Sequence, residues 1–271
     1  MPKATKRERQ RQNRDARRVA VMEAQKRRRR LRSARNLAFL LVPLLILFFV
    51  LQLTRGGNNS TSKATKNGCS TAVPPKPTTT TLAAAPAMTI DPTKQYTAVM
   101  TTSCGTITIA LDARDAPQTV NSFAYLANKG FYNGTRFHRV VADFVDQGGD
   151  PTGTGSGDPG YKLPDEPPAT GYAAGSVAMA NAGTGTTGSQ FFLVVSDSGA
   201  QRLGTAPPYK YSALGTMDAT GLKVAKKING FAPKNSTGTP PTQKVYVTNV
   251  KVTEGGSAAS TTAPTPTTAA R

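Results

Sequence analysis

Residues 137–166 read FHRVVADFVDQGGDPTGTGSGDPGYKLPDE, and this stretch determines what fold the surrounding chain can adopt. Within and beside it, the short apolar runs Thr135–Val141 and Phe144–Gln147 predict two strands, which the glycine-rich loop 148–160 follows. Further along, Ser176–Asn181 and Gln190–Val195 are apolar runs of strand length. The centre of the chain is therefore predicted to be a sheet of short strands.

Alternation of apolar and polar residues extends this sheet in both directions. It occurs over Tyr96–Thr101 and 107–111, which predicts two adjacent antiparallel strands, and Lys244–Val252 predicts a closing strand. Two helices are expected, one over 117–129, between a proline and a glycine, and one at Gly221–Ile228. This pattern predicts a mostly β domain, either a barrel or a sandwich with helical caps.

The positive charge is concentrated at the N-terminus. The 271 residues include 34 Lys and Arg against 15 Asp and Glu, a net charge of +19. Residues 1–35 alone hold 15 basic and three acidic side chains, whereas 96–253 holds 13 and 10. This distribution excludes a uniformly basic nucleic-acid-binding domain. A hydrophobic content of 38% fits one domain of ordinary size with unfolded flanks.

An uncharged apolar run, LAFLLVPLLILFFVLQL, occupies Leu37–Leu53 directly after the basic segment. Its 17 residues are near the lower limit for a bilayer-spanning helix, and no polar face recurs as in a soluble helix. Basic residues precede the run and few follow it, which predicts a cytoplasmic N-terminus. No small-x-small cleavage site follows, so an uncleaved signal anchor is favoured over a cleaved signal peptide.

These features predict five parts along the chain. They are a basic cytoplasmic segment at 1–36, the transmembrane signal anchor at 37–53, a disordered Pro/Thr/Ala-rich linker at 54–95, a folded domain at 96–254 and a disordered tail at 255–271. The expected location is the cell membrane, with a single pass and the folded domain outside. Residues 37–53 would contact membrane lipid.

Two cysteines, one histidine and no tryptophan exclude a disulfide-rich scaffold, a zinc finger and a site built from several imidazoles. Outside the membrane, Cys69 and Cys104 could form a disulfide, because cysteines in oxidising compartments are often paired. A buried thiol at Cys104 is the alternative. The sequence leaves this pairing open.

The windows around 137–150 and 178–192 offer a cation, several amides and several phenylalanines. They contain no nucleophile with an adjacent base and no metal-ligand cluster, so hydrolysis by a catalytic triad is hard to build. An apolar pocket with convergent hydrogen-bonding groups would suit a peptide segment. The single histidine, His138, is expected to be structural, with its ring hydrogen-bonded locally.

The stretch at 137–166, together with AMANAGTGTTGSQFF at 178–192, resembles the cyclophilin family of peptidyl-prolyl cis–trans isomerases over roughly Tyr96–Thr253. The resemblance implies an eight-stranded antiparallel barrel capped by two helices, with the substrate groove on its outer face. It implies isomerisation of X-Pro bonds without a cofactor or a metal.

Residues carry over from the family motif position by position. Arg139 matches the catalytic arginine. The positions that match substrate-binding residues are Phe144, Val145 and Phe192 in the proline pocket, and Gln147, Ala180, Asn181, Ala182 and Gln190 along the peptide backbone. Tyr211 stands where the family often has a histidine, and the groove tryptophan of many members has no counterpart.

The predicted function is therefore prolyl isomerisation of exported proteins outside the membrane, by a monomer whose partners are proline-containing polypeptides. The sequence leaves open a non-catalytic module that binds proline-containing peptides on the same barrel. A weaker alternative makes residues 1–35 an RNA-binding arm, but orientation and lipid contact already account for these charges. No specific nucleic-acid partner is expected.

Overall fold

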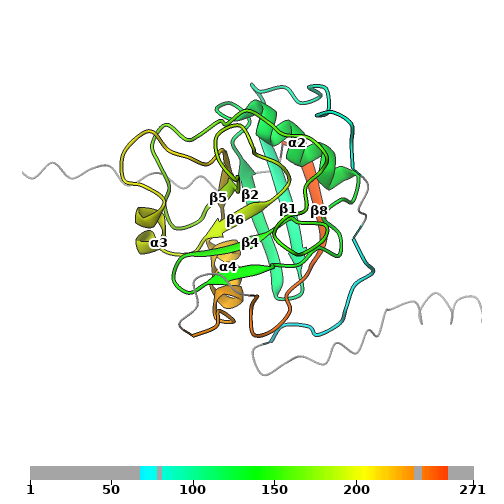
Figure 1. The fold of residues 1–271 in the computed structure, drawn as a ribbon, viewed down its shortest axis with the longest axis vertical. Coiled ribbons are helices and arrows are strands. Elements are labelled where there is room, and N and C mark those ends of the chain that lie inside the picture. Colours follow the sequence, from blue (N-terminus) through cyan, green and yellow to red (C-terminus); the bar gives the residue numbers. More distant parts are fainter. Residues whose placement is uncertain (1–67, 78–80, 235–239, 256–271) are drawn as a thin grey trace, which may run out of the picture. The chain divides into compact units, whose positions relative to one another are not determined.

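The computed structural model describes residues 68–77, 81–234 and 240–255, in which eight strands form one antiparallel sheet (Figure 1). Along the sheet the order is β3-β4-β6-β5-β7-β2-β1-β8. The strands are β1 (Tyr96–Thr102), β2 (Gly105–Leu111), β3 (Arg139–Val141), β4 (Val145–Gly148), β5 (Ser176–Met179), β6 (Phe191–Val194), β7 (Ala213–Met217) and β8 (Val247–Glu254). The expected mostly β, eight-stranded antiparallel fold is confirmed. Of the strand predictions, that at 135–141 is too long, because the strand begins only at Arg139.

The two ends of the sheet meet through the segments that lead into β3 and β8. Arg136 forms a bridge pair with Tyr246, and the Phe137 N–H donates to the Val245 carbonyl at 3.0 Å. These bonds pair the backbone groups next to both edge strands, which would otherwise be open to other chains. The sheet therefore curls round one core.

Three helices lie in the described part: α2 (Pro117–Asn128), α3 (Asp197–Arg202) and α4 (Ala219–Asn229). The helices expected at 117–129 and 221–228 are confirmed as α2 and α4, whereas α3 was not predicted. The first turn of α2 is capped from a distance, since the Glu166 carboxylate accepts from the N–H groups of Gln118 and Thr119 at 3.1 and 2.8 Å. A carboxylate at a helix N-terminus satisfies unpaired donors and complements the helix dipole.

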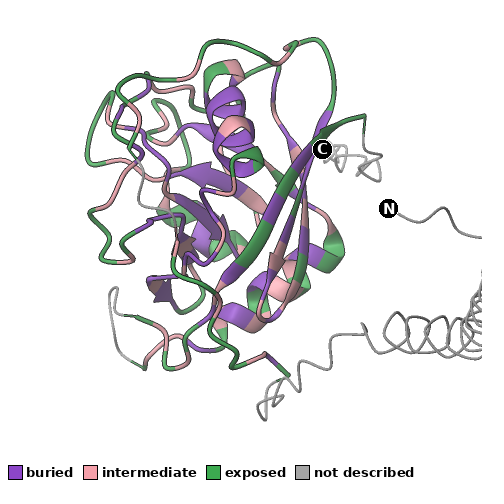
Figure 2. Ribbon diagram, turned by 90° about the vertical axis from the view of Figure 1, so that its right-hand side faces the viewer, coloured by how far each residue is buried: buried purple, intermediate pink, exposed green. Residues whose placement is uncertain are grey.

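The main core fills the inside of the curled sheet, where Figure 2 shows purple segments facing one another. Phe191 lies at its centre, with its ring 5.8 Å from that of Tyr132 and 6.1 Å from that of Phe137. The next residue, Phe192, belongs instead to a second apolar cluster on the opposite face of the sheet. Because successive strand side chains point to opposite faces, Phe191 faces the main core and Phe192 faces away from it.

Residues 68–77 and 81–95, which we call the N-terminal strap, lie against the domain. Leu82 and Ile90 pack on the main core, and the Leu82 N–H donates to the Pro159 carbonyl at 2.7 Å. The Asn121 side chain of α2 accepts from the Thr89 N–H at 2.8 Å. The prediction of a disordered linker at 54–95 is therefore wrong for the strap, because isolated apolar residues in this stretch pack on the folded domain.

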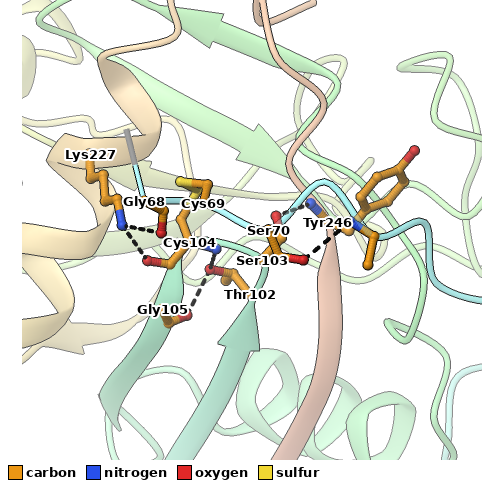
Figure 3. The surroundings of a disulfide bond; sticks show 10 residues. Gly68, Cys69, Ser70, Thr102, Ser103, Cys104, Gly105, Lys227 and Tyr246 are labelled. Atoms are coloured by element: carbon orange, nitrogen blue, oxygen red, sulfur yellow. Dashed lines mark hydrogen bonds between the residues drawn. A yellow bond between two sulfur atoms is a disulfide. The ribbon is translucent and has the colours of Figure 1, made fainter. Parts of the chain in front are cut away.

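A disulfide joins the strap to the turn between β1 and β2 (Figure 3). It links Cys69 to Cys104, which are buried, and the neighbouring Ser70 N–H donates to the Ser103 carbonyl at 2.7 Å. The Lys227 ammonium from α4 donates to the carbonyls of Gly68 and Cys104, at 2.8 and 3.2 Å. The structure thus contains the pairing that the sequence left open.

Among the residues that the structure describes, no helix is long and apolar enough to cross a membrane. The basic segment at 1–36 and the span predicted at 37–53 lie outside those residues, as does the predicted tail beyond residue 255.

Candidate functional site

The register of four strands places the predicted catalytic and pocket residues in one row. Arg139 on β3 pairs with Gln147 on β4, Gln147 pairs with Phe192 on β6, and Phe192 pairs with Ala178 on β5. Directly opposed residues point to the same face of a sheet. The cation, the amide and the aromatic ring of the predicted site therefore share one face, opposite to the main core.

Side-chain amides join this row to the following loop. The Arg139 Nη1 atom donates to Oε1 of Gln147 at 3.3 Å, and Nε2 of Gln147 donates to Oε1 of Gln190 at 3.0 Å. Nε2 of Gln190 donates in turn to the carbonyl oxygens of Gly155 and Gly157, each at 3.0 Å. Each amide is thereby fixed in one orientation, and the chain of bonds ends on the backbone.

The loop itself is organised by the buried carboxylate of Asp150. This carboxylate accepts from the Thr152 N–H at 2.7 Å and from the Gly155 N–H at 2.6 Å. Burial would raise the pKa of Asp150, but the hydrogen bonds from Thr152, Gly157 and Gly155 lower it overall. The glycine-rich loop predicted at 148–160 is thus held together by an aspartate in its first turn.

The second apolar cluster lies on the same face of the sheet as Arg139. It contains Val145 and Phe192, both buried, with the half-buried Phe144 and Tyr211 packed against them. The ring of Tyr211 lies edge-on to that of Phe192, with centroids 5.2 Å apart. The structure thus brings the predicted proline-pocket residues together with Tyr211.

Partial burial lowers the pKa of the Arg139 guanidinium, while the nearby Tyr211 acts in the opposite direction. An arginine nevertheless stays charged in proteins at any physiological pH. Because the group is partly desolvated, its charge acts on a bound partner more strongly than it would in water.

A hollow of about 340 Å³ continues the site beyond Gln147. Its lining includes five of the residues predicted to hold a peptide backbone, which are Gln147, Ala180, Asn181, Ala182 and Gln190. The Ala180 N–H donates to the Gln190 carbonyl at 2.8 Å, and Nδ2 of Asn181 donates to the Lys210 carbonyl at 2.7 Å. The Asn181 side chain is therefore bonded to the backbone of the segment that precedes β7.

The expectation that the His138 ring is hydrogen-bonded locally is wrong within the described residues, since neither ring nitrogen has a hydrogen-bond partner there. The ring is buried under the loop, near Cα of Gly155. Burial lowers the pKa of His138, which the Asp150 carboxylate opposes. The neutral imidazole is a structural neighbour of the row.

Three contributions to the site were absent from the sequence-based prediction. The Arg202 guanidinium of α3 lies 4.0 Å from the centre of the Phe144 ring, a cation–π contact beside the second apolar cluster. Asp150 organises the loop, and Tyr172 holds the backbone of Tyr211. For Asp150, the Asp-Pro-Thr-Gly run indicated a turn. Nothing in the sequence indicated the contributions of Arg202 and Tyr172.

Comparisons with known proteins agree over the described domain. Residues 97–252 match the family model described as "Cyclophilin type peptidyl-prolyl cis-trans isomerase/CLD". The chain is 48% identical over 118 residues to mouse "Peptidyl-prolyl cis-trans isomerase-like 1", covering 42% of this chain and 69% of that protein. It is 40% identical over 164 residues to the Mycobacterium leprae "Probable peptidyl-prolyl cis-trans isomerase B", covering 54% of this chain and about half (53%) of that relative.

Among solved structures, a Cryptosporidium parvum cyclophilin type peptidyl-prolyl cis-trans isomerase crystallised in the presence of the dipeptide Ala-Pro is similar to this chain. The TM-score is 0.52 at 26% identity, and the alignment covers 59% of this chain and 99% of the crystallised one.

Proposed function

The chain belongs to the cyclophilin-type peptidyl-prolyl cis–trans isomerase family and is a peptidyl-prolyl cis–trans isomerase, and we propose that Arg139 is its catalytic residue. The observation that carries this proposal is the row formed by Arg139, Gln147 and Phe192 on one face of the sheet. The row puts a guanidinium on the same face of the sheet as the second apolar cluster, to which Phe192 belongs, and this supports a role for the cluster in binding a proline ring.

Rotation about an X-Pro bond is slow because the nitrogen lone pair is delocalised into the carbonyl, which gives a barrier of about 18–20 kcal/mol. A donor directed at the prolyl nitrogen localises that lone pair and stabilises the twisted state. The Arg139 guanidinium is suited to this role, since it is permanently charged and offers donors in a rigid plane. Its bond to Gln147 holds one donor and so fixes the direction of the others.

The remaining residues bind the substrate. The proline ring packs against the second apolar cluster at Phe144, Val145, Phe192 and Tyr211, where burial of apolar surface stabilises it. The preceding residues of the peptide lie along the hollow lined by Gln147, Ala180, Asn181, Ala182 and Gln190. This binding restrains both sides of the X-Pro bond, so the rotation takes place against a fixed frame.

The direct test is an exchange measurement on an X-Pro peptide, by NMR or in a protease-coupled assay, with the purified full chain. We expect accelerated cis–trans exchange by the parent protein and a loss of at least about tenfold in Arg139→Ala. If the folded parent binds the peptide without accelerating exchange, the domain is a non-catalytic module for proline-containing peptides.

We further propose that the enzyme is a single-pass membrane protein whose domain acts on exported polypeptides outside the membrane. Three observations support this: the apolar run at 37–53, the charge difference across it, and a disulfide, a bond typical of oxidising compartments. Protease added to intact cells or spheroplasts should remove the domain and spare residues 1–36. A domain protected from the protease would contradict the proposed topology, and a soluble, shortened product would indicate a cleaved signal peptide.

A further inference from the structure

One hydroxyl group in the loop before β5 contacts both backbone groups of a pocket residue. The Tyr172 hydroxyl donates to the carbonyl oxygen of Tyr211 at 2.7 Å, and its oxygen accepts from the Tyr211 N–H at 3.0 Å. The two residues are 39 positions apart in the sequence. A side chain that binds both the donor and the acceptor of one distant residue fixes that residue's backbone.

The contact between Tyr172 and Tyr211 lies just beyond the end of the pairing between β5 and β7. β5 and β7 pair as far as Ala178 and Ala213, and the Met179 N–H then donates to the Ser212 carbonyl at 2.9 Å. Tyr211 lies one residue beyond this ladder, where no strand residue remains opposite it. The Tyr172 hydroxyl supplies there the donor and the acceptor that a neighbouring strand would otherwise provide.

Tyr172 is itself held in place. Its ring lies edge-on to Tyr209, with centroids 5.7 Å apart, and it packs on the second apolar cluster. The preceding Gly171 has φ of +84°, and a Cβ atom there would meet the Tyr209 ring at 2.9 Å. Glycine at this position therefore permits the close approach of the two aromatic segments.

The contact is transmitted to the pocket through the Tyr211 ring. That ring lies 5.2 Å from the ring of Phe192, edge-on, and packs against the second apolar cluster. A shift of the Tyr211 backbone would move this wall of the pocket relative to Phe192. On the other side, the Asn181 amide holds the carbonyl of the adjacent Lys210 at 2.7 Å, so the wall is fixed from both ends.

We propose that Tyr172 is a positioning residue for substrate binding, whose hydroxyl sets the Tyr211 wall of the proline pocket and thereby the affinity for X-Pro peptides. This inference rests on the proposed function of the pocket. The Tyr172 hydroxyl acts on the pocket through the Tyr211 backbone, so it should affect binding of the peptide and leave the rotation step at Arg139 unchanged.

The hydroxyl can act in this way over the whole physiological pH range. Burial raises the pKa of Tyr172 to about 12. The phenol therefore remains a donor toward the Tyr211 carbonyl at neutral pH, and the positioning effect should not change between about pH 6 and 9.

The test is Tyr172→Phe in the full chain, which removes the hydroxyl and keeps the ring. Loss of a hydrogen-bonded pair of this kind should raise KM and the peptide dissociation constant about fivefold, with kcat within about twofold of the parent. Amide exchange at Tyr211 should become faster in the variant. Tyr161→Phe is the matched control, because its hydroxyl bonds Ser122 of α2 at 2.7 Å, away from the pocket; it should leave KM unchanged.

A double-variant cycle separates positioning from a general structural effect. In a Tyr211→Ala background the wall is absent, so adding Tyr172→Phe should change KM no further. A persisting effect of Tyr172→Phe, an unchanged KM in the single variant, or a fall in kcat alone would each overturn the inference. In the parent protein, a Tyr211 amide that exchanges as fast as an unprotected one would overturn it without any variant.

The outcomes also distinguish this inference from the function on which it rests. A parent chain without isomerase activity contradicts the proposed catalytic role of Arg139. A parent that is active, with a Tyr172→Phe variant that has the same KM, contradicts only the role of Tyr172.

Discussion

The amide nitrogen of Gln147 donates a hydrogen bond to the amide oxygen of Gln190 at 3.0 Å. This leaves the Gln147 oxygen to accept from Arg139 and the Gln190 nitrogen to bind the carbonyls of Gly155 and Gly157. Rotating either amide would place donors against donors along this chain of bonds. The orientation of the guanidinium is therefore coupled, through two glutamines, to the loop that Asp150 organises.

Replacing Gln147 by alanine should lower kcat/KM for an X-Pro peptide by about fivefold, the effect of losing one orienting hydrogen bond. The loss should be smaller than for Arg139→Ala, because the cation itself remains. The exposed Gln118→Ala on α2 is the matched control and should match the parent. A Gln147→Ala variant with parental kcat/KM would show that Arg139 needs no support from the amide.

Replacing Arg139 by alanine should reduce kcat by at least about tenfold, equivalent to about 1.4 kcal/mol of transition-state stabilisation. Peptide affinity should change much less, since the pocket is intact. Arg139→Lys should also be poor, because a rotating ammonium cannot both bind Gln147 and present an oriented donor to the prolyl nitrogen. The exposed Arg114→Ala serves as the control for loss of charge alone. Single-turnover kinetics and equilibrium binding measure the rate of the rotation step and the peptide affinity separately. Equal losses in rate and in affinity would contradict a role of Arg139 that is confined to the twisted state.

Strand periodicity predicted the sheet because successive side chains point to opposite faces, as Phe191 and Phe192 show by entering different clusters. The residues Arg139, Gln147 and Phe192 were predicted from the resemblance to the cyclophilin motifs, whereas the strand register that aligns them in one row was not predicted. The helix α3 was missed because six residues give too short a period to recognise.

Long-range contacts could not be predicted in this way. Glu166 caps α2 from 47 residues away, and Tyr172 holds Tyr211 from 39 residues away; both depend on loops whose paths no local pattern encodes. The strap was misjudged for a related reason. Leu82 and Ile90 are single apolar residues in a Thr/Pro/Ala-rich stretch, and their burial depends on sites offered by the folded domain.

The Cys69–Cys104 disulfide closes a loop across a sequence separation of 35, so it restricts the unfolded chain. Replacing both cysteines by serine should lower the free energy of unfolding by about 3–4 kcal/mol in the loop-entropy account. The measurement is denaturant unfolding of the oxidised parent and the double variant.

Isomerase activity of the folded variant should be unchanged, because the disulfide lies at the β1–β2 turn and the catalytic row lies on β3, β4 and β6. Adding reductant to the variant should have no further effect, whereas reductant should destabilise the parent. Equal stability of parent and variant would contradict the account.

Asp146 gives the last prediction, on the dependence of stability on pH. It lies beside Gln147 on β4 but points to the core, where Oδ1 accepts from Nδ2 of Asn229 at 2.7 Å and Oδ2 has no hydrogen-bond partner among the described residues. Burial raises the pKa of Asp146 well above its ordinary value of 3.8, and the bond from Asn229 only partly opposes this. The folded protein thus keeps its proton at a pH where the unfolded chain has lost it. The stabilising contribution is therefore complete below the unfolded pKa and is lost as the pH rises through the folded pKa.

The variant Asp146→Asn mimics the protonated form and should equal the parent in stability below about pH 4. Once the parent ionises, the variant should be more stable by at least about 1 kcal/mol, because the parent then buries an incompletely bonded charge. Unfolding free energies measured in steps from pH 3 to 9 test this. The exposed Asp115→Asn is the control and should give a small difference that does not grow in the same way. A gap between Asp146→Asn and the parent that stays flat, or that narrows as the pH rises, would show that the Asp146 carboxyl is not held protonated by its burial.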